Sequence, residues 1–220
     1  MIRSVKLLAL TAIIGVAVAA CGGSSSSTNN VPLDQLPTIQ FVGNSTCPTS
    51  GATPYFTGSN NTVKPAPVNS LPAVGQPIDE MPHTHVQPPA QITYNHNPPT
   101  SGCHYNLGYG DAPIQTGVYN QSVQTEYWVH NLEHGYVVAL YNCPSGCQTQ
   151  FQQLRNWYHS LPNENGFPYP KVIVLPYSGM SVPFAAVSWD WYYPIPVFSV
   201  AEFQKFYDNH HGNGAEAAGP

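Results

Sequence analysis

The sequence predicts an α+β domain in which two helices pack on one face of a mostly antiparallel sheet, with a loop-rich section before them. Two observations support this prediction. Short runs of β-branched and aromatic residues lie in the second half of the chain, and two segments with apolar residues at helical spacing separate and follow them. The predicted order is therefore strand, helix, strand, strand, helix.

The expected strands are short and apolar. Residues 127–129 and 136–141 are rich in aromatic and β-branched side chains and flank a short turn, so we expect a strand on each side of it. Residues 171–175 and 184–193 have a similar composition and complete the predicted strands.

The two expected helices are indicated by different signals. The first is predicted from apolar residues that recur at helical spacing, namely Phe151, Leu154, Trp157, Tyr158 and Leu161. The second begins at a capping box made by Ser199 and Glu202, carries apolar Phe203 and Phe206, and is ended by Gly212.

The N-terminus is typical of an exported bacterial lipoprotein. Residues 1–20 combine a positive start with a short apolar stretch and small residues, which predicts a signal peptide. Cys21 follows at once and is the expected lipidation site, although an ordinary secretory peptide remains the alternative. The Gly- and Ser-rich start of residues 21–40 is expected to form a flexible linker. We therefore expect a lipid-anchored protein in the cell envelope, outside the cytoplasm.

The rest of the chain is expected to hold one domain. Residues 41–212 form the predicted α+β domain, whose first part, to about residue 90, is dense in Pro, Asn, Ser, Thr and Gly. Residues 213–220 are small and polar and are expected to be a disordered tail.

The charge balance argues against a nucleic-acid partner. Only 8% of the 220 residues are charged, and eleven acidic residues outnumber six Lys and Arg for a net charge of −5. A protein that binds nucleic acid needs a basic surface to neutralise phosphates. We expect contact with a membrane through the lipid anchor only, and the sequence identifies no protein partner.

Four cysteines follow Cys21, and an even number in an exported chain indicates disulfides. We predict that Cys143 pairs with Cys147, because the two are close in sequence, and that Cys47 pairs with Cys103. A thiolate metal or redox site is the alternative.

Histidine is the unusual feature of the composition, because nine histidines outnumber the Lys and Arg residues. Six of them lie between residues 83 and 134: His83, His85, His96, His104, His130 and His134. The other three, His159, His210 and His211, lie near the ends of the expected helices, where a partly positive side chain suits the helix dipole.

The segment His130-Asn-Leu-Glu133-His134-Gly135 carries the strongest chemical signal. Residues four apart lie on the same side of a helix or a strand, so both imidazoles can bind one ion. The pattern His-x-x-Glu-His also occurs in zinc peptidases, where it lies on a long helix. Here Gly135 and the following Val137-Val138 favour a strand, which disfavours a peptidase. Two hydrogen-bonded structural histidines are a further alternative.

Three motifs resemble the bacterial family catalogued as domain of unknown function 3105. They are Pro98–His104 (PPTSGCH), Gly117–Tyr119 (GVY) and Val129–Gly135 (VHNLEHG), and the resemblance covers about residues 80–210. The chain departs from the family pattern at Cys103, where the family commonly has proline, and in its additional pair of cysteines at 143 and 147.

The resemblance implies which histidines belong together. The upstream histidine of the family corresponds to His85, with His83 as a second possibility, and the next corresponds to His104. The final pair corresponds to His130 and His134, with Glu133 between them as a ligand or a hydrogen-bond acceptor. If the fold brings these residues together, they form a nitrogen-rich site suited to one copper or zinc ion.

The expected function is therefore transition-metal binding or handling in the cell envelope, through His85, His104, His130, His134 and Glu133. A metal-dependent enzyme, hydrolytic or redox, is the first alternative. A structural or adhesive lipoprotein without metal is the second.

Overall fold

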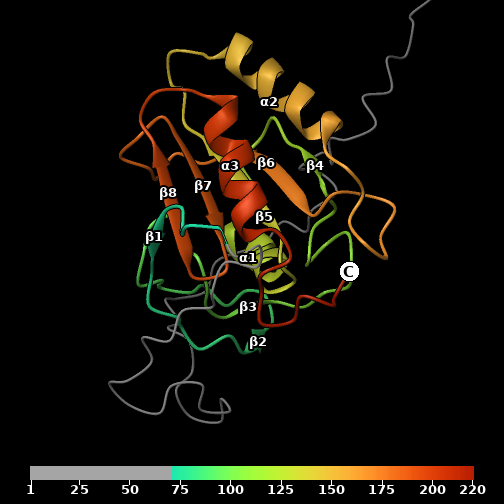
Figure 1. The fold of residues 1–220 in the computed structure, drawn as a ribbon. Coiled ribbons are helices and arrows are strands. Elements are labelled where there is room, and N and C mark those ends of the chain that lie inside the picture. The colour runs from blue at the N-terminus through green and yellow to red at the C-terminus, as the bar shows by residue number, and fades with distance from the viewer. Residues whose placement is uncertain (1–70) are drawn as a thin grey trace, which may run out of the picture.

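A computed structural model describes residues 71–220, and Figure 1 shows their fold. Within this range the helices are α1 (Thr125–Glu133), α2 (Gln148–Ser160) and α3 (Val200–His210). The strands are β1 (Gln76–Pro77), β2 (His85–Val86), β3 (His104–Tyr105), β4 (Gly117–Val118), β5 (Val137–Tyr141), β6 (Val172–Pro176), β7 (Phe184–Ser188) and β8 (Trp191–Ile195). The predicted signal peptide, the predicted lipidation site Cys21, the predicted linker and Cys47 lie outside the described residues.

The main sheet has six strands in the order β1-β8-β7-β5-β6-β4, and β2 and β3 form a separate parallel pair. The pairings of β1 with β8, β8 with β7 and β7 with β5 are antiparallel. The pairings of β5 and β4 with β6 are parallel, and α2 connects β5 to β6. The fold is therefore α+β with a mixed, mostly antiparallel sheet, as the sequence predicts.

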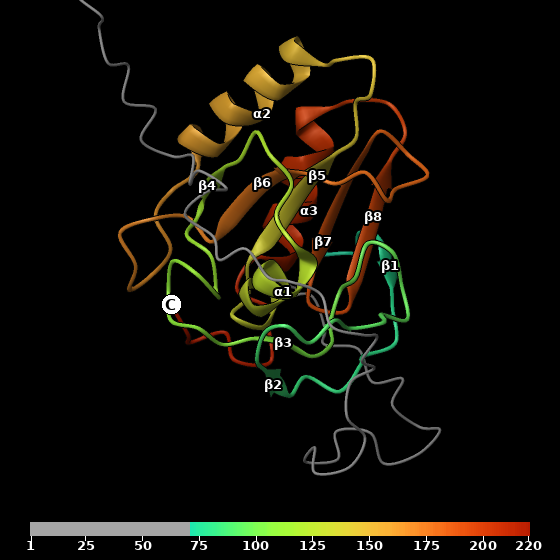
Figure 2. The same cartoon turned by 180° about the vertical axis from the view of Figure 1, so that it is seen from behind.

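Both faces of the sheet are covered. Alternate residues of β5 and β6 belong to two different apolar clusters, so the strands are buried on both sides and read as continuous apolar runs. Helices α2 and α3 cover one face, which confirms the predicted packing of two helices. Helix α1 packs on the opposite face, as Figure 2 shows from behind.

Helix α1 is the main correction to the sequence prediction. Residues 127–129 were expected to form a strand, and they lie instead in the middle of this helix. Trp128 and Leu132 are one helical turn apart, and both are fully buried in the cluster beneath α1. Their packing outweighs the strand preference of the local Tyr-Trp-Val sequence, because apolar burial is worth more than intrinsic propensity.

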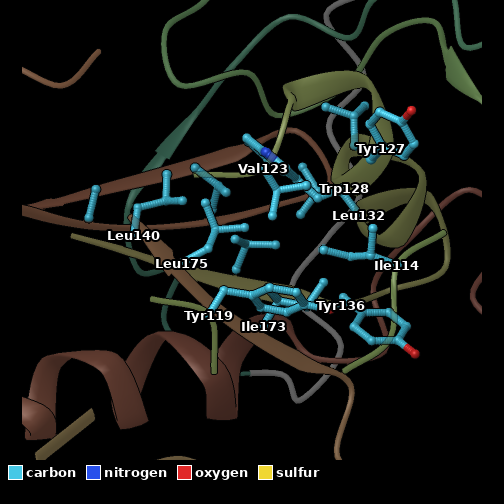
Figure 3. Close-up of a cluster of buried hydrophobic side chains, with 14 of the residues drawn as sticks. Ile114, Tyr119, Val123, Tyr127, Trp128, Leu132, Tyr136, Leu140, Ile173 and Leu175 are labelled. Atoms are coloured by element: carbon cyan, nitrogen blue, oxygen red, sulfur yellow. The ribbon is translucent and has the colours of Figure 1, made fainter. Parts of the chain in front are cut away.

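Figure 3 shows the cluster that holds α1 on the sheet, in which side chains of the helix lie against residues of β5 and β6. Asn131 fixes the helix further, because its side chain accepts a hydrogen bond from the backbone N–H of Ile114 at 3.0 Å and donates one to the carbonyl of Ile114 at 2.8 Å. A buried amide that is satisfied in both directions fixes the rotation of the helix as well as its position.

The remaining predicted elements are confirmed with small shifts of their bounds. The expected strand over 184–193 is a hairpin of two strands, since Asp190 between them adopts a positive φ of 62°. The expected N-cap is present, because the Ser199 side chain accepts a hydrogen bond from the backbone N–H of Glu202. In residues 71–220 no helix is both long enough and apolar enough to span a membrane.

One of the two predicted disulfides is observed. Cys143 and Cys147 are bonded to each other, so neither sulfur is free to act as a thiolate ligand. The predicted pairing of Cys103 involves Cys47, which lies outside the described residues.

His210 is buried at the end of α3 rather than presenting a positive charge to solvent. Its Nε2–H donates to the carbonyl of Val74 at 2.7 Å, and its ring packs on Trp191 and Phe206. Burial lowers the pKa of His210 to about 4, against an opposing hydrogen bond to the backbone. The side chain is therefore neutral at physiological pH, and the expected interaction of a charged imidazole with the helix dipole is wrong.

We predict that the chain loses stability as the pH falls from about 6.5 to about 4, partly through His210. Between its folded pKa of about 4 and its ordinary value of 6.5, the unfolded state binds more protons, so protonation favours unfolding. The contribution of His210 is about 3 kcal/mol. Urea unfolding at pH 7 and pH 4 should show a pH effect that is smaller by this amount in His210→Gln than in wild type. His159→Gln, at the exposed end of α2, is the control, and equal pH effects in all three proteins would contradict the prediction.

Candidate metal centre

The small β2–β3 pair brings two of the predicted ligands together. In the parallel register of these strands His85 lies opposite His104, and their ring centroids are 4.9 Å apart. His104 is fully buried, whereas the side chain of His85 is partly exposed. The strand pair therefore places one imidazole inside the protein and the other at its edge.

The last turn of helix α1 forms the other side of the site. His130 and Glu133 are three residues apart and share a helix face. The ring of His130 lies 4.6 Å from that of His104 and 4.9 Å from that of His85, measured between centroids. Figure 2 shows α1 beside β3, at the end of the molecule where β2 also lies.

Four side chains thus converge from three separate segments. One ligand atom from each of them lies within 4.8 Å of the others, and we call this set the first donor group: His85, His104, His130 and Glu133. A tetrahedral zinc ion with bonds of about 2.0 Å has ligand atoms about 3.3 Å apart. The carboxylate of Glu133 already lies 3.0 Å from Nε2 of His104 and 3.5 Å from Nε2 of His85.

Backbone carbonyls orient two of these imidazoles. Nδ1 of His104 lies 2.8 Å from the carbonyl oxygen of Gly102, and Nδ1 of His130 lies 2.6 Å from that of Tyr105. A carbonyl oxygen only accepts hydrogen bonds, so Nδ1 carries the proton in both rings. In a neutral imidazole Nε2 is then left as a lone pair, which is the arrangement that metal-binding histidines require.

The contact between His104 and Glu133 is the most informative in the group. Nε2 of His104 and Oε2 of Glu133 face each other at 3.0 Å, both are buried, and neither has a hydrogen-bond partner within residues 71–220. A neutral His104 presents a lone pair to a carboxylate lone pair, and these repel each other. The contact requires a proton or a metal ion between the two atoms.

The charges in the site follow from these contacts. Burial acts to raise the pKa of Glu133, but the close approach of the His104, His83 and His85 imidazoles holds that pKa well below its ordinary range. Burial, followed by the proximity of His104 and His134, lowers the pKa of His130 to about 3. At neutral pH Glu133 is therefore an anion and His130 is a neutral donor.

His83 was the second possibility for the upstream histidine ligand, but it lies beside Glu133 and outside the first donor group. Its Nδ1 lies 2.5 Å from Oε1 of Glu133, on the opposite oxygen from the one that faces His104. Its ring packs edge-on against Trp189, with centroids 5.3 Å apart. His83 therefore orients the carboxylate rather than joining the first donor group.

His134 also departs from the expected single four-histidine site. Its ring lies next to that of His130, with centroids 4.6 Å apart, but its ligand atom groups with different residues. We call this set the second donor group: Glu133, His134 and Glu216. Glu216 was not predicted from the sequence, because it lies in a segment of small residues without a motif.

Residues 213–220 are packed against the site, whereas the sequence predicted a disordered tail. We call them the C-terminal segment. The backbone N–H of Glu216 donates to the carbonyl of Glu133 at 2.8 Å, and Nδ1 of His134 lies 2.9 Å from the carbonyl oxygen of Pro220. A Cβ atom at Gly219 would lie 2.7 Å from the His134 ring, so this close approach needs glycine.

Lys171 holds the C-terminal segment from inside the protein. Its side chain is 1% exposed, and Nζ donates hydrogen bonds to the carbonyl oxygens of His134, Ala217 and Gly219 at 2.9, 2.7 and 2.8 Å. Burial lowers the pKa of this lysine, and the nearby Glu164 opposes that effect. A buried ammonium that donates three hydrogen bonds fixes the segment beside the end of α1.

These features define an α+β domain with a buried histidine–carboxylate site at the end of a short helix. A family model described as Protein of unknown function (DUF3105) matches residues 85–219, which is more than half of the chain. The chain belongs to this family. The matched range includes both donor groups and all of the C-terminal segment except Pro220. Comparisons with curated proteins and with solved structures gave no match.

We predict that Lys171→Met releases the C-terminal segment. The variant keeps an unbranched side chain of nearly the same length but loses all three hydrogen bonds, so local opening should become easier by at least about 1.4 kcal/mol, or tenfold in amide exchange. Hydrogen exchange at the Glu216 amide reports this change directly.

Lys205→Met is the matched control for this prediction, because Lys205 is exposed on α3. Exchange at the Glu216 amide should stay at the wild-type rate in that variant. The role assigned to Lys171 is wrong if its substitution also leaves the rate unchanged.

Proposed function

We propose that this protein binds a copper or zinc ion through His85, His104, His130 and Glu133, and that it handles this metal in the cell envelope. The contact between His104 Nε2 and Glu133 Oε2 is the observation that supports the proposal most directly. A proton can be shared by only two atoms, whereas four donor atoms converge here. One metal ion would satisfy all four.

The donor set favours a transition metal over calcium or magnesium. Three imidazole nitrogens and one carboxylate oxygen suit zinc or copper, whereas calcium and magnesium take oxygen ligands. The anionic Glu133 would offset part of the charge of a divalent cation. The neutral His130 would offer its lone pair without first releasing a proton.

The cell envelope is proposed as the location on two grounds. The N-terminal sequence is typical of a lipoprotein signal with Cys21 as the lipidation site. The Cys143–Cys147 disulfide is of the kind that persists in oxidising compartments outside the cytoplasm. Metal capture from the surroundings is a function that suits this location.

A metal-dependent hydrolase is the second candidate, because the His-x-x-Glu-His residues begin on a helix rather than on the expected strand. In zinc peptidases the two histidines of this motif bind one ion and the glutamate acts as a base. Here Glu133 is grouped with His130 as a donor, and three histidines surround its carboxylate. This geometry favours a ligand role for Glu133.

The Glu133→Gln variant separates the two candidates. If Glu133 is a ligand, the variant loses metal affinity. If Glu133 is a catalytic base, the zinc-loaded variant retains the ion and loses hydrolysis of a peptide substrate.

We predict that the full-length chain, purified in detergent without a histidine tag and given one equivalent of Zn²⁺ or Cu²⁺, retains close to one ion after gel filtration. His104→Ala and His130→Ala should each lose the ion, because each removes a donor of the first group. Elemental analysis measures the retained metal. X-ray absorption should show nitrogen and oxygen neighbours without sulfur.

Two histidine variants serve as controls. His159→Ala removes an exposed histidine at the end of α2 and should retain the ion. His134→Ala should also retain it, because His134 belongs to the second donor group. The proposal fails if wild type holds no metal, or if His104→Ala holds as much as wild type.

A further inference from the structure

The second donor group shares Glu133 with the first and adds His134 and Glu216. Glu133 and His134 end α1, and Glu216 reaches them from the C-terminal segment. One ligand atom from each of the three lies within 4.8 Å of the other two. Two carboxylates and one imidazole thus converge, and the side chains of His134 and Glu216 do not belong to the first donor group.

We propose that the second donor group binds a second divalent cation, and that the carboxylate of Glu133 bridges the two ions. This inference rests on the proposed function, because Glu133 is shared with the first donor group. A carboxylate has two oxygens with about four lone pairs, so it can serve two ions at once. Two-metal sites with shared carboxylates are a common arrangement in proteins.

The burial of the group distinguishes it from a chance surface cluster. Glu133 is 1% exposed and His134 is 6% exposed. Only Glu216 is open to solvent, which leaves a route by which an ion and water ligands could enter.

His134 is oriented as a ligand by the C-terminal segment. Its Nδ1 lies 2.9 Å from the carbonyl oxygen of Pro220, so Nδ1 carries a proton and Nε2 is free to bind. Nε2 lies 3.8 Å from Oε2 of Glu216, which is too long for a direct hydrogen bond. A cation that binds both atoms would occupy the space between them.

The charges permit a cation at this position. Glu133 and Glu216 carry two negative charges, and Lys171 is the nearby positive group. Its ammonium donates to three carbonyl oxygens and lies 4.3 Å from the Phe167 ring centroid. The backbone hydrogen bond from Glu216 to Glu133 keeps the second carboxylate at the end of α1. Two oxygen donors and one nitrogen donor, completed by water, suit zinc.

The test is a titration of the full-length chain in detergent with Zn²⁺ against a competing chelator. We expect two ions per wild-type chain and one in Glu216→Gln, whose affinity for the second equivalent should fall at least tenfold. His104→Ala should lose the tightly held first ion and bind only the second, too weakly to be retained through gel filtration. Asp208→Asn removes one carboxylate from the exposed side of α3 and should still bind two.

The outcomes separate this inference from the proposed function. One ion in wild type, with the same affinity in Glu216→Gln, overturns the second site and leaves the first in place. No ion in wild type overturns both. Glu216 is exposed, so Glu216→Gln should fold normally, and an unchanged melting temperature without metal would confirm that its effect is on binding.

Discussion

The rest of the site depends on the burial of one carboxylate. Glu133 is 1% exposed and is the last residue of α1, where the negative end of the helix dipole opposes another negative charge. An ionised carboxylate in such a place is costly unless positive or hydrogen-bonding groups surround it. Three histidines approach its carboxylate oxygens from other segments. The backbone N–H of Glu216 donates a hydrogen bond to its backbone carbonyl. The short strands and the C-terminal segment therefore surround the Glu133 carboxylate and offset the cost of its burial.

The core supplies the rigidity that such a site requires. Trp128 and Leu132 fix α1 against the sheet, and Asn131 sets its rotation through two hydrogen bonds to Ile114. His130 and Glu133 of α1 are then directed at β2 and β3, and the helix is not free to rotate. Donor atoms that are positioned before a metal arrives lose less entropy when they bind it.

Helices and strands with a periodic sequence pattern could be predicted from the sequence. Features that depend on contacts between distant residues could not. Strands β5 and β6 and helices α2 and α3 carry patterns over many residues, so their positions could be predicted. Helix α1 is short and rich in strand-forming residues, and only its packing on the sheet makes it helical. His104, His130 and Glu133 could be predicted from motifs, whereas Glu216 has no local signal and is placed by Lys171 and by a backbone hydrogen bond.

The two histidines of the motif show why spacing alone does not define a metal site. His130 and His134 are four residues apart, and their rings are neighbours, yet their Nδ1 atoms hydrogen-bond in different directions. Nδ1 of His130 faces the carbonyl of Tyr105 on β3, and that of His134 faces Pro220 at the end of the C-terminal segment. Each carbonyl fixes where the opposite nitrogen points. The pair is thus divided between two donor groups, and Glu133 is the residue that the groups share.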